Sequence, residues 1–297
     1  MTFGRTLWAL ALLAASTGAM AQAKTTRIVV SFVAGGPVDA VARVLSEQLG
    51  KELGRTVVIE NKPGGNGAIG AMEVLRAEPD GSTIWITSVG AAAINPALYE
   101  KLPYDMVRDF APVSLVVNND ELLVANPADP AKDAAEFVAN AKKAKDPLAM
   151  GSTGIGSIPH LAIEQLGDAT GVKFLHVPYK GAAPAITDLM GGQVSGFFGD
   201  VPGLIGHVKS GKLKALGMAS RKRHPVLPEV KTLEEQGIHG VDTINWYAFF
   251  VSAKTPPAVV EALNKATRAT LTTPAVRDRL LQAGAEPAPS TPQELAA

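Results

Sequence analysis

The sequence predicts an α/β protein of two lobes, each a largely parallel sheet flanked by helices. Strand-like and helical patterns alternate along most of the chain, which is typical of parallel sheets covered on both faces. Two further strand patterns, at 114–126 and 241–252, are suited to cross between the lobes. Abundant alanine and 29 glycines fit helices that pack closely on sheets.

The first 21 residues are predicted to be a secretory signal peptide. Arg5 forms a basic start, residues 7–15 are apolar, and Ala19-Met20-Ala21 is an A-x-A cleavage pattern. The apolar core is too short to cross a membrane as a helix. The mature chain is therefore expected to be soluble in the periplasm.

The first lobe is expected to begin as strand, helix and strand. The run 27–32 is a strand, and 39–53 is an amphipathic helix with its apolar side chains on one face. The remaining expected elements are a strand at 56–60, a glycine loop, a helix at 67–77, a turn at 79–81, a strand at 82–88, a polar connection at 95–113 and the strand at 114–126.

The second lobe is expected to repeat this alternation. Its predicted elements are helices at 131–144, 184–192 and 203–211, a glycine loop with a helix at 154–167, and strands at 147–152, 172–179, 193–200 and 213–220. Strand character returns near 241, and 257–284 is helical. We therefore assign 26–124 and 243–297 to lobe one, and 125–242 to lobe two.

The end of the sequence carries a helix start. Thr291, Pro292 and Glu294 form a capping-box pattern with proline at the first helical position. Only one turn follows, so this helix is expected to contribute little alone. Lobe one is therefore expected to be less stable unless other packing compensates.

Composition excludes several functions. The sequence has 28 basic and 28 acidic residues and no basic run, which argues against nucleic-acid binding. It has no cysteine, so disulfides, thiolate metal sites and a cysteine nucleophile are absent. No metal and no organic cofactor is expected.

Gly65, Gly67 and Gly70 form a G-x-G-x-x-G pattern between a strand and a helix, as in dinucleotide-binding folds. Such a fold needs its first glycine at the strand end and an acidic residue at the end of the next strand. Here Asn61–Gly65 intervene, and the best acidic candidate, Asp80, lies in a turn. These glycines are therefore expected to shape the turn and to admit the helix close to the sheet.

Two other strand–helix loops, 31–40 and 149–162, are also rich in glycine, and the second also carries serine and threonine. Glycines let backbone N–H groups approach a ligand, and helix N-termini attract anions. Such loops facing each other across a cleft would hold a small carboxylate. Asp39 is read as the N-cap of its helix, as a ligand contact, or as both. In the contact role, its replacement by alanine should weaken binding and preserve the fold.

Catalytic patterns are weak. Met150 occupies the first glycine position of the nucleophile-elbow pattern G-x-S-x-G. The histidines are scattered, without the His-x-x-x-His spacing of zinc sites. His160, close to Ser157, is expected to pack or to contact a ligand.

The chain resembles the Bug family, the periplasmic solute-binding proteins of tripartite tricarboxylate transporters. The matching segments occur in the family order: "GGPVD", "VIENKPGGNGAIGA", "PDGSTI", "INPALYEKLPYD", "RDFAPV", "GSTGIGSIPHLA", "HVPYKGAAPAITDLMGGQV" and "GKLKALGMAS". The resemblance implies a two-lobed type II periplasmic-binding-protein fold that closes on a small carboxylate. It also implies a monomer that delivers this ligand to the membrane subunits of such a transporter.

The resemblance also implies the binding residues. One jaw is expected to contain Phe32, Ala34, Gly35, Gly36 and Asp39, and the other Ser152, Thr153, Gly156 and Ser157. Thr87, Ser88, Tyr179 and Asp200 lie at later strand ends and are expected to complete the pocket.

Two segments depart from the family pattern. Val38 stands where many relatives have threonine or serine, and "SVGAAAINP" lacks a polar pair often present before the Asn-Pro. Both changes make the pocket wall more apolar. Two other functions remain open from the sequence: a binding protein that feeds a sensor, and a secreted enzyme acting on a small carboxylate.

Overall fold

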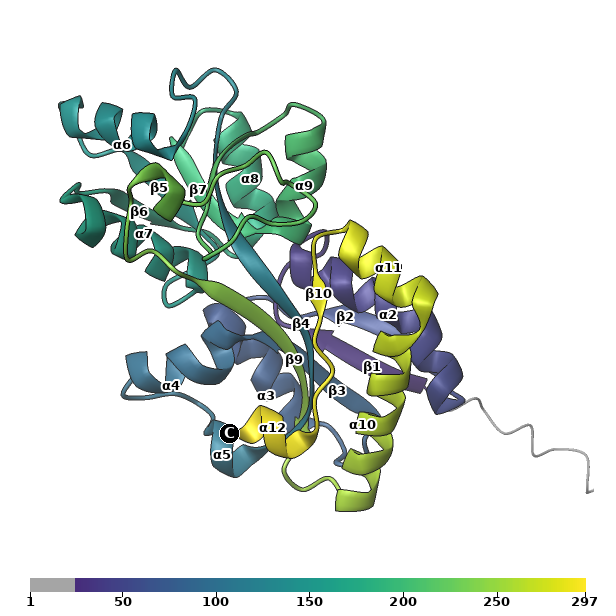
Figure 1. Ribbon diagram of the computed structural model, residues 1–297. Helices are drawn as coiled ribbons and strands as arrows, with labels where there is room; N and C mark the ends of the chain where they lie inside the picture. Colours follow the sequence, from purple (N-terminus) through teal and green to yellow (C-terminus); the bar gives the residue numbers. More distant parts are fainter. Residues whose placement is uncertain (1–24) are drawn as a thin grey trace, which may run out of the picture.

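The computed structural model describes residues 25–297, so the predicted signal peptide lies outside the described part. Two groups of helices and strands are joined by two long strands, β4 (Phe110–Ala125) and β9 (Ile244–Ser252), which run diagonally through the molecule (Figure 1). These strands pair antiparallel with each other from Phe110↔Ser252 to Asp120↔Ile244. The predicted crossing strands are therefore confirmed.

The sheet of the first lobe begins with three parallel strands in the order β2 (Thr56–Asn61), β1 (Thr25–Val30) and β3 (Thr83–Ser88). β9 then pairs antiparallel with β3. The short β10 (Glu286–Pro287) pairs with β4.

Helices cover both faces of this sheet. One core contains apolar side chains of α2 (Pro37–Leu53), α10 (Pro257–Thr272) and α11 (Pro274–Gln282). The core on the other side contains Trp85 and side chains of α3 (Ala68–Arg76). Because helices cover both faces, every residue of β3 is buried.

The second lobe has the same plan. β7 (Gly196–Asp200), β5 (Ala149–Ser152) and β6 (Leu175–Pro178) are parallel, and β4 pairs antiparallel with β7 and with β8 (Lys214–Met218). One core involves α6 (Ala134–Lys143) and α7 (Ile158–Thr170), and another involves α8 (Ala182–Met190) and α9 (Val201–Lys209). The predicted α/β class is confirmed, with parallel strands in each lobe and antiparallel crossing strands between them.

Several element boundaries differ from the expected ones. The helical run 257–284 is broken at Pro274, which starts α11 because proline lacks an N–H and fixes its φ. α2 begins at Pro37, two residues earlier than expected. The expected polar connection contains a π-helical turn at Gly90–Ile94, α4 (Asn95–Leu98) and α5 (Met106–Asp109).

Short helices complete the structure. Single 3-10 turns occur at Gly65–Gly67 and Glu234–Gln236. The predicted capping box is confirmed at α12 (Pro292–Ala296), because the Thr291 N–H donates to Glu294 Oε2 and Thr291 Oγ1 accepts from the Glu294 N–H. Within residues 25–297, no helix has both the length and the apolar character needed to cross a bilayer.

The lobe boundaries 124/125 and 242/243 stay a prediction.

Candidate functional site: a cavity between the two lobes

A small, partly open cavity lies where the lobes meet. Phe32, Gly36, Pro37, Val38, Ser88 and Asn245 line it from the first lobe and the crossing strand β9. Thr153, Ser157, Ile158, Ala182 and Asp200 line it from the second lobe. The carboxyl ends of β1, β3, β5 and β7 thus surround one space, which is where ligands of open parallel sheets bind.

Four helices begin at this cavity. Gly36 is the N-cap of α2, Ser157 of α7 and Asp200 of α9, while Ala182 is the first residue of α8. The first N–H groups of a helix have no partner inside that helix, and the helix dipole is positive there. The helix N-termini around the cavity therefore favour an anion, whereas the Asp200 carboxyl group disfavours one at its own wall.

The two lobes contact each other beside the cavity. A Cβ added to Gly156, which has φ +75°, would lie 2.6 Å from Leu98 Cδ2 of the other lobe. A Cβ added to Gly203 would lie 3.2 Å from the Pro37 ring. Glycine at these positions lets the lobes approach closely enough to enclose a small molecule.

Asp39 is not the N-cap of α2, which corrects the expectation from the sequence. It is the third helical residue, 2 % exposed. Its Oδ2 accepts the Gly35 N–H (3.0 Å) and Arg43 Nε (2.8 Å), and its Oδ1 accepts Arg43 Nη2 (3.0 Å) and Asn61 Nδ2 (2.9 Å).

These four bonds change the role of Asp39. Burial alone would raise the pKa of Asp39, but the hydrogen bonds from Arg43, Gly35 and Asn61 outweigh it and hold the pKa below its usual range. The carboxylate fixes the loop before α2 and is not among the residues that line the cavity.

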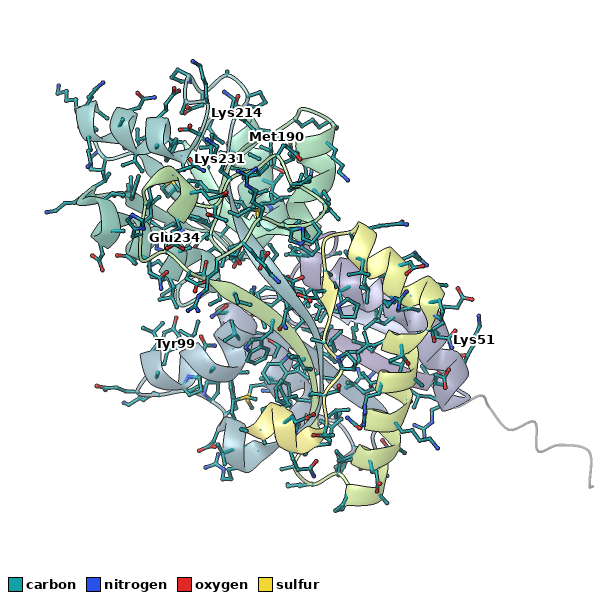
Figure 2. All side chains as sticks on the ribbon, viewed as in Figure 1. Lys51, Tyr99, Met190, Lys214, Lys231 and Glu234 are labelled. Carbon is teal, nitrogen blue, oxygen red and sulfur yellow. The ribbon has the colours of Figure 1, made fainter. Side chains whose placement is uncertain are left out.

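A second, more open cavity adjoins the first and shares Phe32 and Thr153 with it. Its other lining residues are Ser31, Gly64, Gly65, Asn66, Gly67, Tyr99, Gly154, Ile155, Pro178, Tyr179 and Lys180. Tyr99 is labelled between α4 and the second lobe in Figure 2. The glycine loop that suggested a dinucleotide therefore forms part of the wall between the lobes.

The expected role of the glycines in close packing is also confirmed. A Cβ at Gly70 would lie 2.7 Å from Ser31 Oγ and 3.3 Å from Trp85 Nε1, so α3 lies directly on the sheet. Asn66, at φ 45°, is held by its Nδ2 donating to Asn95 Oδ1 (3.0 Å).

The structure places the thirteen predicted site residues in three groups. Those that line the first cavity are Phe32, Gly36, Ser88, Thr153, Ser157 and Asp200. Tyr179 lines the second, and its hydroxyl donates to Asp188 Oδ2 (2.7 Å). Those that line neither cavity are Ala34, Gly35, Asp39, Thr87, Ser152 and Gly156.

The residues outside both cavities support those inside. Ser152 Oγ contacts His176 Nε2 (2.6 Å) and accepts the Gly154 N–H (3.1 Å). The His176 ring stacks on that of His160, with centroids 3.9 Å apart, and His160 Nδ1 accepts the Gly156 N–H (3.2 Å). Burial, with His160 adding to it, lowers the pKa of His176 to about 4. The two histidines therefore pack beneath the 152–157 loop and fix it.

Asn245 lines the cavity although it was not predicted. It lies on β9, and its Nδ2 donates to Asp200 Oδ2 (3.2 Å). The Tyr247 hydroxyl donates to the same oxygen (2.5 Å). Glu121 on β4 faces Asp200 in the strand register and is fully buried. A glutamate and an asparagine inside strand patterns were the available signals for this cluster.

The two carboxyl groups of this cluster differ in pKa. Burial, with the nearby charge of Asp200 adding to it, raises the pKa of Glu121 well above its ordinary value. Burial also raises the pKa of Asp200, but hydrogen bonds from Tyr247 and Asn245 oppose this. Burial therefore favours a shared proton on the pair, and the pKa of Glu121 is raised further than that of Asp200.

Glu121→Gln is expected to raise the melting temperature increasingly as the pH rises from 4 to 8. A carboxyl whose pKa is higher in the folded state stabilises the fold below its unfolded pKa, about 4.3, and loses that contribution as the pH rises. Glutamine keeps the shape and removes the titration. Calorimetric scans of the wild-type protein and of Glu121→Gln from pH 4 to pH 8 measure this difference in melting temperature. Glu78→Gln, a substitution of an exposed residue, is the control. A difference that stays constant with pH would contradict the assignment.

Two lobes joined by crossing strands, with an enclosed cavity at the helix N-termini, define a solute-binding protein of the periplasmic type. Sequence similarity identifies the family within this class. Residues 41–297 match the TctC model, described as the tripartite tricarboxylate transporter family receptor, and the chain belongs to this family.

Related proteins agree over most of the chain. Protein BugT of Bordetella pertussis is 32% identical over 92% of this chain and 84% of its own length. The structure of the periplasmic binding protein BugD is 37% identical with a TM-score of 0.86, covering 91% of each chain. MatC from Rhodopseudomonas palustris, solved with bound malate, is 34% identical with a TM-score of 0.83, covering 88% of this chain and 89% of its own.

No group of three or more His, Asp or Glu side chains within residues 25–297 is arranged to hold a metal ion. Asp200 forms no ion pair with any residue in this part of the chain, and no Lys, Arg or His among the described residues lines the first cavity. The cavity therefore offers backbone N–H groups, hydroxyls, the Asn245 amide and one carboxyl group as its polar groups.

Proposed function

We propose that this protein captures a small carboxylate in the cavity between its lobes and delivers it to the membrane subunits of a tripartite tricarboxylate transporter. It acts in the periplasm, as a monomer, and without a cofactor. The observation that carries the proposal is the convergence of the N-termini of α2, α7, α8 and α9 on one enclosed space.

The chemistry of the walls supports a carboxylate. Helix N-termini provide oriented N–H donors, and Ser88, Thr153 and Ser157 add hydroxyl donors that carry no fixed charge. Such donors bind an anion without the strong ion pair that would slow its release. The family description and the malate in MatC support the same ligand class and a transporter as the receiving partner.

The two alternatives have less support. A binding protein that feeds a sensor would use the same cavity, but the family is described as transporter receptors. An enzyme would need a reactive group in the cavity. The histidines nearest to it, His160 and His176, instead hold the 152–157 loop from below.

A thermal-shift screen tests the proposal. Mono-, di- and aromatic carboxylates, amino acids and nicotinate are added to the protein, and the matching uncharged amides serve as controls. A ligand at 100 times its dissociation constant stabilises the folded state by about 2.7 kcal/mol. We expect at least one carboxylate to raise the melting temperature by several degrees and its amide to have no effect. Stabilisation by amides alone would contradict carboxylate capture.

Delivery is tested separately. Membrane vesicles that contain the transporter subunits should take up the stabilising carboxylate only when the purified protein is present. Uptake of equal rate without it would contradict the transport role and leave binding intact.

A further inference from the structure

We propose that Asp200 and Asn245 form a hydrogen-bond-accepting subsite that selects carboxylates carrying an ammonium or hydroxyl group as well. The inference rests on the proposed function, because it concerns the second end of the same ligand. It assigns a specificity role to one wall of the cavity.

Asn245 contributes an acceptor that has no partner. It is 5 % exposed and lines the cavity, and its Nδ2 is engaged by Asp200 Oδ2. This bond fixes the orientation of the amide and leaves Oδ1 free to accept a hydrogen bond. Asn245 Oδ1 is buried and accepts no hydrogen bond from any described residue. Leaving such an atom unpaired costs free energy that a donor on a ligand recovers.

Asp200 contributes a charge that has no counter-ion. It is 6 % exposed, lines the cavity and receives two neutral donors, the Tyr247 hydroxyl and Asn245 Nδ2. Glu121 lies opposite it on β4, and burial together with the charge of Asp200 raises the pKa of Glu121 well above its ordinary value. One negative charge therefore lies at a cavity wall where no described Lys, Arg or His side chain compensates it.

These two features orient the ligand. Asp200 repels a carboxylate, while the N-termini of α2 and α7 attract one. The ligand carboxylate therefore lies toward Gly36 and Ser157, and the donor group lies toward Asp200 and Asn245. A site built to accept a hydrogen bond discriminates strongly against an analogue that lacks the donor.

Titration calorimetry at pH 7 with succinate, malate and aspartate tests the subsite. The three ligands share one carbon skeleton and differ by hydrogen, hydroxyl or ammonium at one position. The wild-type protein should bind malate and aspartate at least tenfold more tightly than succinate.

Two variants separate charge from shape. Glu121→Gln keeps the Asp200 charge and should keep this preference within about threefold. The double variant Glu121→Gln/Asp200→Asn has no carboxyl group that could take over the charge. It should lose at least tenfold in affinity for aspartate and lose none for succinate. Asp242→Asn, an exposed residue near the start of β9, is the control for a lost surface charge.

The outcomes are distinct. Wild-type protein that binds all three ligands equally would overturn the subsite and leave carboxylate capture standing. So would a double variant that folds and keeps the preference, or one that loses all three ligands equally. If the double variant fails to fold, Asn245→Ala provides the second test and should reduce aspartate binding more than succinate binding. Failure of every carboxylate to bind wild-type protein would overturn the proposed function itself.

Discussion

Gly67→Ala is expected to lower the free energy of unfolding by about 2–4 kcal/mol, the sum of overpacking and left-handed backbone strain. Gly67 has φ +99°, and an added Cβ would lie 2.6 Å from Ala91 Cβ and 3.2 Å from Thr87 Oγ1. Neither neighbour is the end of a flexible side chain, so the backbone must shift. Urea unfolding of both proteins measures the loss.

Gly54→Ala is the matched control. Gly54 also has a left-handed φ, +61°, but an added Cβ there meets nothing within 4 Å. It should cost only the backbone strain, about 1–2 kcal/mol. Equal losses for the two variants would show that the contact with the 90–94 segment does not matter.

Asp39→Ala is expected to destabilise the protein by roughly 2–3 kcal/mol, because a buried charged acceptor of four hydrogen bonds is removed. The Gly35 N–H loses its partner, and the loop before α2 is no longer fixed. Binding should weaken as a consequence, since Phe32, Gly36 and Val38 of the same segment line the cavity. Thermal unfolding and titration calorimetry on the same samples measure both effects.

Asp133→Ala tests whether this effect is particular to the loop. Asp133 is the N-cap of α6, far from the cavity lining, and its side chain accepts the Glu136 N–H (2.9 Å). Its removal should cost about 1 kcal/mol and leave ligand affinity unchanged. An Asp39→Ala protein with wild-type stability and weakened binding would instead place Asp39 in direct contact with the ligand.

The fold was largely predictable from the sequence because its signals are local. Runs rich in β-branched and aromatic residues, such as 82–88, and amphipathic runs such as 39–53 identify strands and helices without reference to distant residues. Boundaries were less certain, as at Pro274, where one expected helix is two. The capping box at Thr291 was correct because its partner is three residues away.

The site was predictable in part. Glycine and hydroxyl residues at strand ends indicated the loops that face the cavity, and Gly36, Thr153 and Ser157 do line it. Asp39 was misread as an N-cap, because the sequence does not show that Asn61, on the neighbouring strand β2, donates to it. Asn245 was missed: an asparagine inside a strand pattern is unusual, but the sequence does not show which side chains it meets.

The sequence by itself determined the alternation of strands and helices, the α/β class and the glycine loops at the strand ends, because each depends on neighbours within a few residues. Only the tertiary structure decided which polar groups meet. Glu121, Asp200 and Asn245 come from three strands, and their contact depends on the register in which β4, β7 and β9 pair. A shift of one residue would turn each side chain to the other face of the sheet, so their chemistry exists only in the folded chain.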